Sequence, residues 1–365
     1  MNVVDVDERW MKRALDLASE AMYLSSPNPR VGCVLTDDAG QILGEGFTQA
    51  AGQAHAEIMA LRDAQARGHS TQGATAYVTL EPCSHQGRTG PCCVALSDAG
   101  VARVVVAGTD PNPLVSGQGL AYLRSRGITV EVGLLGAQAH ELNIGFFSRM
   151  TRQRPWVRLK IAASLDGQTA LGNGVSQWIT SAEARADGHA WRARSCAVLT
   201  GMGTIREDNP MLDVREVATP RQPALVVVDS RLETPSTARL WQTQRPIWIY
   251  GAQPDTAASQ ALCKLGADVR CLPDSQGKVD LAAMMSDLAQ RGVNELHIEA
   301  GYLLNGSLLR SGLVDELLIY LAPKMLGLGR GMAHLPEFTE LSQAPGFKWV
   351  ECTPIGPDLR LRARL

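Results

Sequence analysis

Apolar and polar positions follow two different periods along the first half of the chain. A repeat of three to four residues predicts a helix over 7–22, with an apolar face made of Trp10, Met11, Leu15, Ala18 and Met22. Two short apolar runs flank an Asp-Asp-Ala-Gly turn and predict a strand pair over 31–47. Further segments predict helices over 56–68 and 92–100 and strands over 74–80 and 101–108. This alternation is typical of a layered α/β domain.

The second half of the chain restarts the alternation. Strand-like runs cover 156–164, 196–204, 224–230, 247–251, 296–301 and 316–325, and helical patterns lie near 182–193, 281–291 and 303–311. Between the halves, FFSRMTRQRP at 146–155 combines basic residues with a proline, which indicates a linker. We therefore expect two α/β domains, residues 1–150 and 151–365, as a length of 365 residues also favours.

The net charge and the cysteine content limit the kinds of molecule that the protein is expected to bind. A net charge of -2 gives no electrostatic reason to expect binding to nucleic acid or to an anionic membrane. The start, MNVVDVDERW, lacks the apolar segment of a signal peptide, and the chain has no apolar run long enough to span a bilayer. Eight cysteines in a chain of this length are too few for a disulfide scaffold. We expect a cytoplasmic protein whose clustered cysteines bind metal.

One stretch of the first half gathers metal-binding residue types. His55 precedes one predicted helix, Cys83 follows a predicted strand, and Cys92 begins another predicted helix. Helix N-termini favour thiolate, and three protein ligands leave one zinc position open for water, as in catalytic sites. Zinc lowers the pKa of that water, and Glu57, two residues after His55, is placed to carry protons to a leaving amine. The alternative is a closed structural site with His85 or Cys93 as fourth ligand.

The motif resembles a known family. His-Ala-Glu followed by Pro-Cys is similar to the pattern of zinc nucleobase deaminases. Those deaminases that act on cytidine or polynucleotides have two residues between the cysteines, whereas Cys83 and Cys92 are separated by eight. Together with PNPRVG at 27–32 and AGTDPNPLVSGQG after the cysteines, this longer loop resembles the pyrimidine deaminase of riboflavin biosynthesis, which is commonly fused to a reductase.

At two positions the sequence differs from that family's motif, and both differences bear on the affinity of the deaminase for its substrate. Thr48 stands where the family often has histidine, and Gly90 stands where it often has a second proline. Neither change touches the expected zinc ligands. Weaker candidates for substrate contact in this domain are Asn28, with a turn-forming role as its alternative, and His85 and Arg88 on the loop between the cysteines, with plain solvent exposure as theirs.

The resemblance extends to the second half, where KIAASLDGQTA and VSQWITSAEAR resemble the opening of the family's reductase. It implies a dihydrofolate-reductase-like fold with a mainly parallel sheet. The cofactor contacts that it implies fall on Ala162, Trp178, Thr204, Asp208, Ser230, Gly301, Tyr302, Leu303, Leu304, Asn305, Gly306 and Ser307. The substrate contacts that it implies fall on Ser176, Arg192, Leu212, Arg215 and Glu299.

Some of these residues also have a case of their own. Arginine suits phosphate through paired hydrogen bonds, although Arg192 and Arg215 without the resemblance are more simply surface arginines. Trp178 is by default a packed core aromatic, and the strand, glycine and helix of IEAGYLLNGSLLRSG offer a helix N-terminus for pyrophosphate.

The resemblance thus implies a bifunctional enzyme with one zinc per chain and NADPH. It would hydrolyse the exocyclic amine of 2,5-diamino-6-(5-phosphoribosylamino)pyrimidin-4-one and then reduce the ribosyl group of the product to ribityl phosphate. It also implies small phosphoribosyl pyrimidines as ligands and a homo-oligomer formed through the reductase domain. Two rivals are a deaminase of nucleosides or tRNA and a zinc-stabilised binding module that merely holds a nucleotide.

Overall fold

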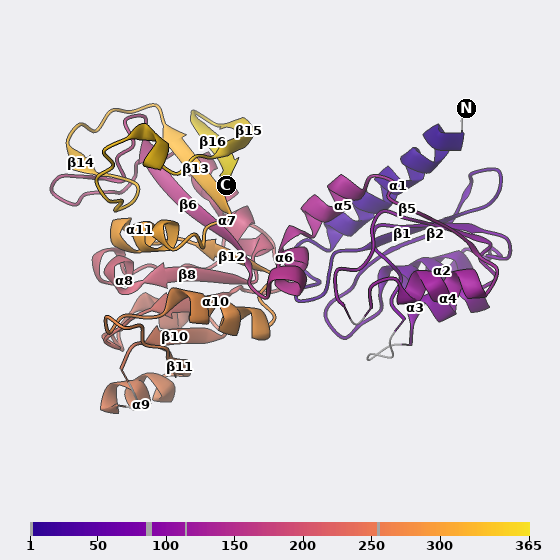
Figure 1. Cartoon of the computed structure of the whole chain (residues 1–365), viewed down its shortest axis with the longest axis horizontal. Coiled ribbons are helices and arrows are strands. Elements are labelled where there is room, and N and C mark those ends of the chain that lie inside the picture. The colour runs from indigo at the N-terminus through magenta and orange to yellow at the C-terminus, as the bar shows by residue number, and fades with distance from the viewer. Residues whose placement is uncertain (1–2, 85–89, 114, 254–255) are drawn as a thin grey trace. The chain divides into compact units, whose positions relative to one another are not determined.

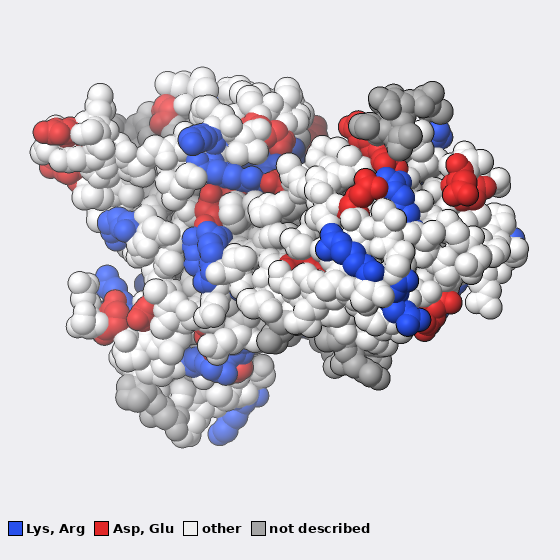
Figure 2. Space-filling model, turned by 45° about the vertical axis from the view of Figure 1, so that its right-hand side comes forward, with Lys and Arg blue, Asp and Glu red and all other residues white. Residues whose placement is uncertain are grey.

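A computed structural model describes residues 3–84, 90–113, 115–253 and 256–365. The chain divides into two compact units, Met1–Gln153 and Arg154–Leu365 (Figure 1). Among the described residues, no helix is long and apolar enough to cross a membrane. On the face drawn in Figure 2, acidic and basic side chains are interspersed rather than gathered into a field of one sign.

The first unit alternates helices with short strands. Its elements in chain order are α1 (Val3–Glu20), β1 (Gly32–Thr36), β2 (Ile42–Phe47), α2 (Ala56–Ala66), β3 (Thr75–Val78), α3 (Cys92–Asp98), β4 (Arg103–Val106), α4 (Gln118–Ser125), β5 (Thr129–Val132), α5 (Gly136–Leu142) and α6 (Ile144–Arg152). The five described strands form one sheet in the order β2-β1-β3-β4-β5. Strand β1 is antiparallel to both neighbours, whereas β3, β4 and β5 run parallel.

Helices cover both faces of this sheet, because successive strand residues point to opposite sides. Cys33, Ala76 and Val104 face one core that also contains apolar residues of α2, α3, α4 and α6. Val34 and Tyr77 face the other core, which α1 and α5 complete. Helix α1 buries a face slightly rotated from the expected one: Ala14 and Leu17 join Trp10, Met11 and Ala18, and Leu15 is only partly buried.

The prediction of a linker at 146–155 is wrong for most of that segment. Helix α6 runs to Arg152 and belongs to the first unit. Phe146 is buried in the first unit's core, and the Arg152 guanidinium binds the Ser148 hydroxyl one turn earlier. Two of the basic residues that suggested a linker, Arg149 and Arg152, therefore belong to the polar side of an amphipathic helix.

The second unit is built on one large sheet. Its elements are β6 (Trp156–Ser164), β7 (Ala170–Leu171), α7 (Ala182–Arg194), β8 (Ala197–Gly201), α8 (Met202–Asp208), β9 (Ala224–Val228), η1 (Arg239–Gln242), β10 (Ile247–Gly251), α9 (Ala257–Lys264), β11 (Ala267–Cys271), α10 (Leu281–Gln290), β12 (Glu295–Ile298), α11 (Tyr302–Arg310), β13 (Glu316–Ala322), β14 (Gly329–Arg330), η2 (Leu341–Gln343), β15 (Lys348–Ile355) and β16 (Asp358–Arg364). Strand order in the large sheet is β11-β10-β9-β8-β12-β6-β13-β16-β15.

This sheet is parallel except at β16 and β15, which confirms the mainly parallel expectation. Leu199 and Val226 face a core with α10 and α11, while Val198, Leu225 and Val227 face a second core with α8 and α9. The strand expected over 196–204 is partly wrong, because the chain turns into α8 at Met202. The parallel strands β8, β9 and β12 therefore end at one edge of the sheet, with α8 after β8, α11 after β12 and a loop after β9. This is the kind of edge at which α/β sheets bind ligands.

Candidate functional site

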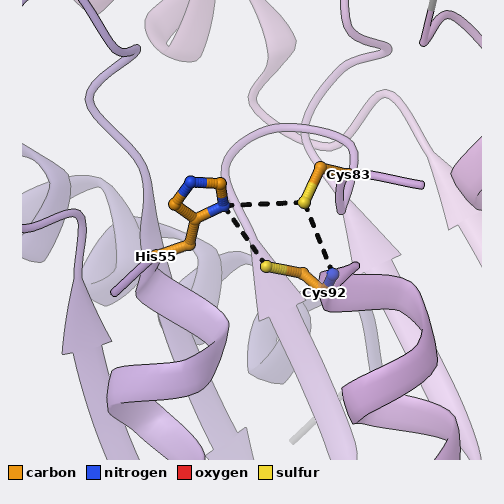
Figure 3. A group of neighbouring side chains, drawn as sticks. All are labelled: His55, Cys83 and Cys92. Atoms are coloured by element: carbon orange, nitrogen blue, oxygen red, sulfur yellow. Dashed lines mark hydrogen bonds between the residues drawn. The ribbon is translucent and has the colours of Figure 1, made fainter. Parts of the chain in front are cut away.

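Three residues from separate segments of the first unit converge on one point. His55 is the residue before α2, Cys92 is the first residue of α3, and Cys83 lies in the loop after β3. Helices α2 and α3 lie on the same face of the sheet, so their N-termini approach each other (Figure 3). The ligand atoms of the three residues all lie within 4.8 Å of one another.

The spacing of these atoms fits zinc. His55 Nδ1 lies 3.5 Å from Cys83 Sγ and 3.4 Å from Cys92 Sγ. Zinc–sulfur bonds of about 2.3 Å and zinc–nitrogen bonds of about 2.1 Å at tetrahedral angles place the two donor atoms about 3.6 Å apart. Cys93, one alternative fourth ligand, packs in the apolar core instead, and the other, His85, lies outside the described residues. The donor set therefore resembles three ligands of a tetrahedral site more than a closed four-ligand site.

The charges around the cluster influence one another. The hydrogen bond from Cys92 holds the pKa of the Cys83 thiol well below its usual value, and the hydrogen bond with Cys83 raises the pKa of His55. Glu57 is buried in the first turn of α2, and that burial, followed by the negative charge of Cys83, raises its carboxyl pKa to about 7. A carboxyl with this pKa can both accept and release a proton near neutral pH.

Close backbone packing fixes where α2 begins. A Cβ on Gly46 would lie 2.5 Å from both Ala56 O and Ala60 N, and one on Gly44 would lie 2.3 Å from Ala60 O. Only glycine at these two positions of β2 lets α2 approach so closely. The sequence GEG in 44–46 is thus what allows the helix that carries Glu57 to lie against the sheet.

The loop that carries Cys83 is held by a residue that the motif analysis did not select. The Glu81 carboxylate is buried and accepts four backbone hydrogen bonds, from Asp110, Gly117, Gly119 and Leu120, over 2.9–3.4 Å. The Asp110 and Gly117 amides lie between β4 and α4, and the Gly119 and Leu120 amides belong to the first turn of α4. Glu81 therefore ties the Cys83 loop to a distant stretch of the chain. An acidic residue directly before Pro-Cys was the only signal of this in the sequence.

The weaker candidates of the first unit have mixed surroundings. Asn28 closes a turn, with its N–H on Ser25 O at 2.8 Å, so the turn-forming role is present and a substrate role stays a prediction. Thr48 is buried, and its Oγ1 lies 3.2 Å from Val31 N, from which it accepts a hydrogen bond. Gly90 is exposed, and His85 and Arg88 lie outside the described residues.

A cavity of about 660 Å³ lies at the sheet edge of the second unit. It lies beside the glycine turn after β8, the end of β9 and the N-terminal turns of α11. The residues implied for the cofactor that line it are Thr204, Ser230, Gly301, Tyr302, Leu303, Leu304 and Ser307. Gly301 immediately precedes α11, whose first N–H groups are available to an anion.

The other residues implied for the cofactor, Ala162, Trp178, Asp208, Asn305 and Gly306, are not part of that lining. Asn305 is buried and donates to Met332 O at 2.9 Å, and Gly306 packs against the backbone of His334. Trp178 is 62% exposed with the Arg185 guanidinium over its ring, so the default reading of a packed core aromatic is wrong.

The residues implied for the substrate include a partly buried ion pair. Arg192 on α7 binds both carboxylate oxygens of Glu299, and its Nη1 also donates to Asp213 O at 2.9 Å. Burial raises the pKa of Glu299, but the charges of Arg192 and Lys160 lower it well below the usual value. Lys160 on β6, which sequence reasoning missed, has its Nζ 3.6 Å from Glu299. Glu299 is therefore a largely buried anion, 12% exposed, that is held by two cations.

The remaining substrate candidates differ in accessibility. Arg215 is half exposed, with Nη1 at 2.7 Å from Asp213 Oδ1, so its guanidinium can still reach a ligand. Leu212 is buried, and its carbonyl accepts from Arg245 at 2.6 Å, which leaves little of it to touch a substrate. Ser176 is partly exposed.

Two family models match this chain, one in each unit. The model described as the cytidine and deoxycytidylate deaminase zinc-binding region matches residues 4–108, which contain His55, Cys83 and Cys92. The model described as the RibD C-terminal domain matches residues 155–361. The first unit is thus a cytidine-deaminase-like zinc domain and the second a reductase domain, as the sequence predicted.

Relatives that match over the whole chain point to the same two-domain family as the family models. The riboflavin biosynthesis protein RibD of Escherichia coli strain K12 is 45% identical over 97% of this chain and 98% of its own length, and that of Haemophilus influenzae is 43% identical over 96% and 95%. The structure of Acinetobacter baumannii RibD, form 1, matches with a TM-score of 0.89 at 40% identity, over 99% of each chain. A Thermotoga maritima diaminohydroxyphosphoribosylaminopyrimidine deaminase/5-amino-6-(5-phosphoribosylamino)uracil reductase matches with a TM-score of 0.88 at 30% identity, over 100% of this chain and 99% of that one. With a zinc-binding deaminase domain, a reductase domain and relatives of this similarity, the chain belongs to the RibD family of bifunctional deaminase–reductases of riboflavin biosynthesis.

Proposed function

We propose that the first unit deaminates 2,5-diamino-6-(5-phosphoribosylamino)pyrimidin-4-one and that the second unit reduces the ribosyl group of the resulting uracil with NADPH. The observation that carries the deaminase assignment is the convergence of His55, Cys83 and Cys92 beside a buried Glu57. For the domain boundary we propose residues 1–150 and 151–365, which the two compact units support to within a few residues.

In the deaminase, we assign the three ligands to zinc and proton transfer to Glu57. A zinc ion bound there supplies Lewis acidity that lowers the pKa of a water molecule. The Glu57 carboxylate accepts a proton from the attacking water and delivers it to the departing amino group, so that water and the amine become a carbonyl and ammonia. Glu57 is placed for this transfer because it is buried in the first turn of the helix that follows His55.

In the reductase, the chain mainly binds and orients its ligands, because hydride chemistry belongs to the nicotinamide. The cavity beside Thr204, Ser230 and the start of α11 is the proposed NADPH site, with pyrophosphate at the α11 N-terminus. Arg215 is the proposed partner of the substrate phosphate, because its guanidinium is half exposed, and the Lys160–Glu299–Arg192 cluster orients the sugar.

We also propose association through the second unit. Strand β15 lies at the edge of the nine-stranded sheet and exposes Trp349 and Val350, which supports a contact there. Sedimentation of residues 154–365 alone checks this proposal, and a monomer at micromolar concentration contradicts it.

Selective removal of zinc tests the division of labour. A chelator should abolish ammonia release from the diaminopyrimidine substrate, while NADPH oxidation with the already deaminated substrate continues and circular dichroism changes little. A protein that unfolds on chelation would instead hold a structural zinc. A protein that loses both activities together would not have two separate sites.

A further inference from the structure

Charged side chains gather on one side of the cavity in the second unit. Arg206 extends from α8, and Arg231 and Glu233 follow strand β9. Strands β8 and β9 are parallel neighbours, so the segments after them lie beside each other at the same sheet edge. The two arginines thus reach the cavity from separate segments.

The segment that carries Arg231 and Glu233 is held rigidly. The buried Asp229 carboxylate accepts hydrogen bonds from Thr234 N and Thr234 Oγ1, both at 2.7 Å, and Leu232 N donates to Asp229 O at 3.0 Å. Leu232 is buried in the core against Gly251, where a Cβ would lie 2.7 Å from its Cδ2. Because Leu232 points inward, its two neighbours Arg231 and Glu233 are presented outward.

Both arginines contact the same carboxylate. Arg206 Nη2 lies 2.9 Å from Glu233 Oε2, and Arg231 Nη1 lies 3.9 Å from Glu233 Oε1. The arginine side chains are 66% and 77% exposed, so these ion pairs contribute little to stability and exchange readily. Two guanidinium groups therefore share one negative charge, an arrangement that a dianion satisfies better.

We propose that Arg206 and Arg231 bind the phosphate monoester on the adenosine ribose of NADPH, and that Glu233 holds the two arginines together while the cavity is empty. This inference rests on the proposed function of the second unit. A phosphate monoester carries a charge of about -1.5 to -2 at neutral pH and offers three acceptor oxygens. It displaces Glu233, whereas the ribose hydroxyl of NADH cannot. The pair therefore sets the preference for NADPH over NADH.

Other charged groups of the same lining behave differently. Arg330 lies 2.6 Å from Glu207 and its charge also acts on Asp208, so carboxylates already neutralise this cation. Asp229 has one buried carboxylate oxygen without a hydrogen-bond partner within the described part of the chain. A carboxylate at the end of a strand favours a ribose hydroxyl and hence NADH, so Asp229 is the competing determinant. The Asp229 oxygen is buried and the two arginines are exposed, which favours the arginines as the first contact of a ligand.

Binding of four ligands to the full-length, zinc-loaded protein tests the proposal by calorimetry. Arg206→Ala and Arg231→Ala should each weaken NADPH binding about tenfold, the worth of one charged hydrogen bond. NADH binding should change by less than about twofold, because its ribose hydroxyl makes no such bond. Adenosine 2′,5′-bisphosphate should lose affinity in parallel with NADPH, and adenosine 5′-phosphate should not. Glu233→Gln should tighten NADPH binding alone, since it removes a competing charge.

Arg239→Ala is the matched control, because Arg239 is exposed outside the cavity lining and its loss removes the same charge. An equal loss of NADPH affinity in the control would reduce the effect to general electrostatics and overturn the proposal. Equal losses for NADPH and NADH, unchanged affinities in both variants, or a wild type that prefers NADH would overturn it too. If the wild type binds NADPH but the variants do not show the expected losses, the proposed role of the two arginines fails and the assignment of NADPH as cofactor stands. If the wild type binds neither nucleotide, that assignment fails as well.

Discussion

The Glu81 carboxylate offers a sharp test of how the deaminase loop is held. Glu81→Gln keeps the shape but replaces one oxygen by an NH₂ group, which then faces two backbone N–H donors. Of the four hydrogen bonds from Asp110, Gly117, Gly119 and Leu120, two are lost. Each hydrogen bond to a charged acceptor contributes about 1.5–3 kcal/mol, so the substitution should lower the free energy of unfolding by roughly 3–6 kcal/mol.

A loss of that size is a large part of the roughly 5–15 kcal/mol that stabilises a typical domain. Urea unfolding, followed by a probe in the first unit, measures the loss directly, and metal analysis should show less zinc because Cys83 follows Glu81 by two residues. Glu8→Gln is the control, because the exposed Glu8–Lys12 pair at 3.1 Å should contribute no more than about 0.5 kcal/mol. If Glu81→Gln unfolds within about 0.5 kcal/mol of the wild type, the argument from the four hydrogen bonds is refuted.

Three further predictions address the two active sites. Glu57→Gln should lower the rate of deamination by roughly two to four orders of magnitude, while the zinc content and NADPH oxidation with the already deaminated substrate are retained. Near-normal ammonia release would exclude Glu57 as the proton carrier. Cys92→Ala should lose the zinc and Cys93→Ala should keep it, as metal analysis can determine, because the Cys93 side chain packs in the core. A fragment of residues 154–365 should oxidise NADPH with the deaminated substrate and release no ammonia, and within it Arg215→Ala should weaken substrate binding roughly ten- to a hundredfold with NADPH affinity retained. Loss of NADPH affinity instead would show that the two ligands had been exchanged.

Local sequence patterns predicted the elements whose signals are themselves local. The helix over 56–68 ends as expected, with Gly68 at positive φ just beyond α2, and the strand over 156–164 matches β6. His55, Cys83 and Cys92 were selected from residue type and helix starts, and the structure brings them together because α2 and α3 share one face of the sheet.

Features that depend on distant contacts were not predictable in this way. The basic residues of α6 suggested a linker, because nothing nearby in sequence shows that Phe146 has a core to enter. The role of Glu81 depends on backbone amides that lie 29 to 39 residues later in the chain. The exposure of Trp178 also follows from tertiary structure. The residue type alone favours burial, because tryptophan side chains are highly buried on average.

The balance of the two reactions tests the central claim most directly. The purified protein is given the diaminopyrimidine substrate, and ammonia release and NADPH oxidation are followed together. We expect ammonia to form with or without NADPH and, when NADPH is present, the oxidation to continue until one NADPH has been consumed for each ammonia released. NADPH oxidation without ammonia release, or no ammonia from a protein shown to contain zinc, would contradict the account.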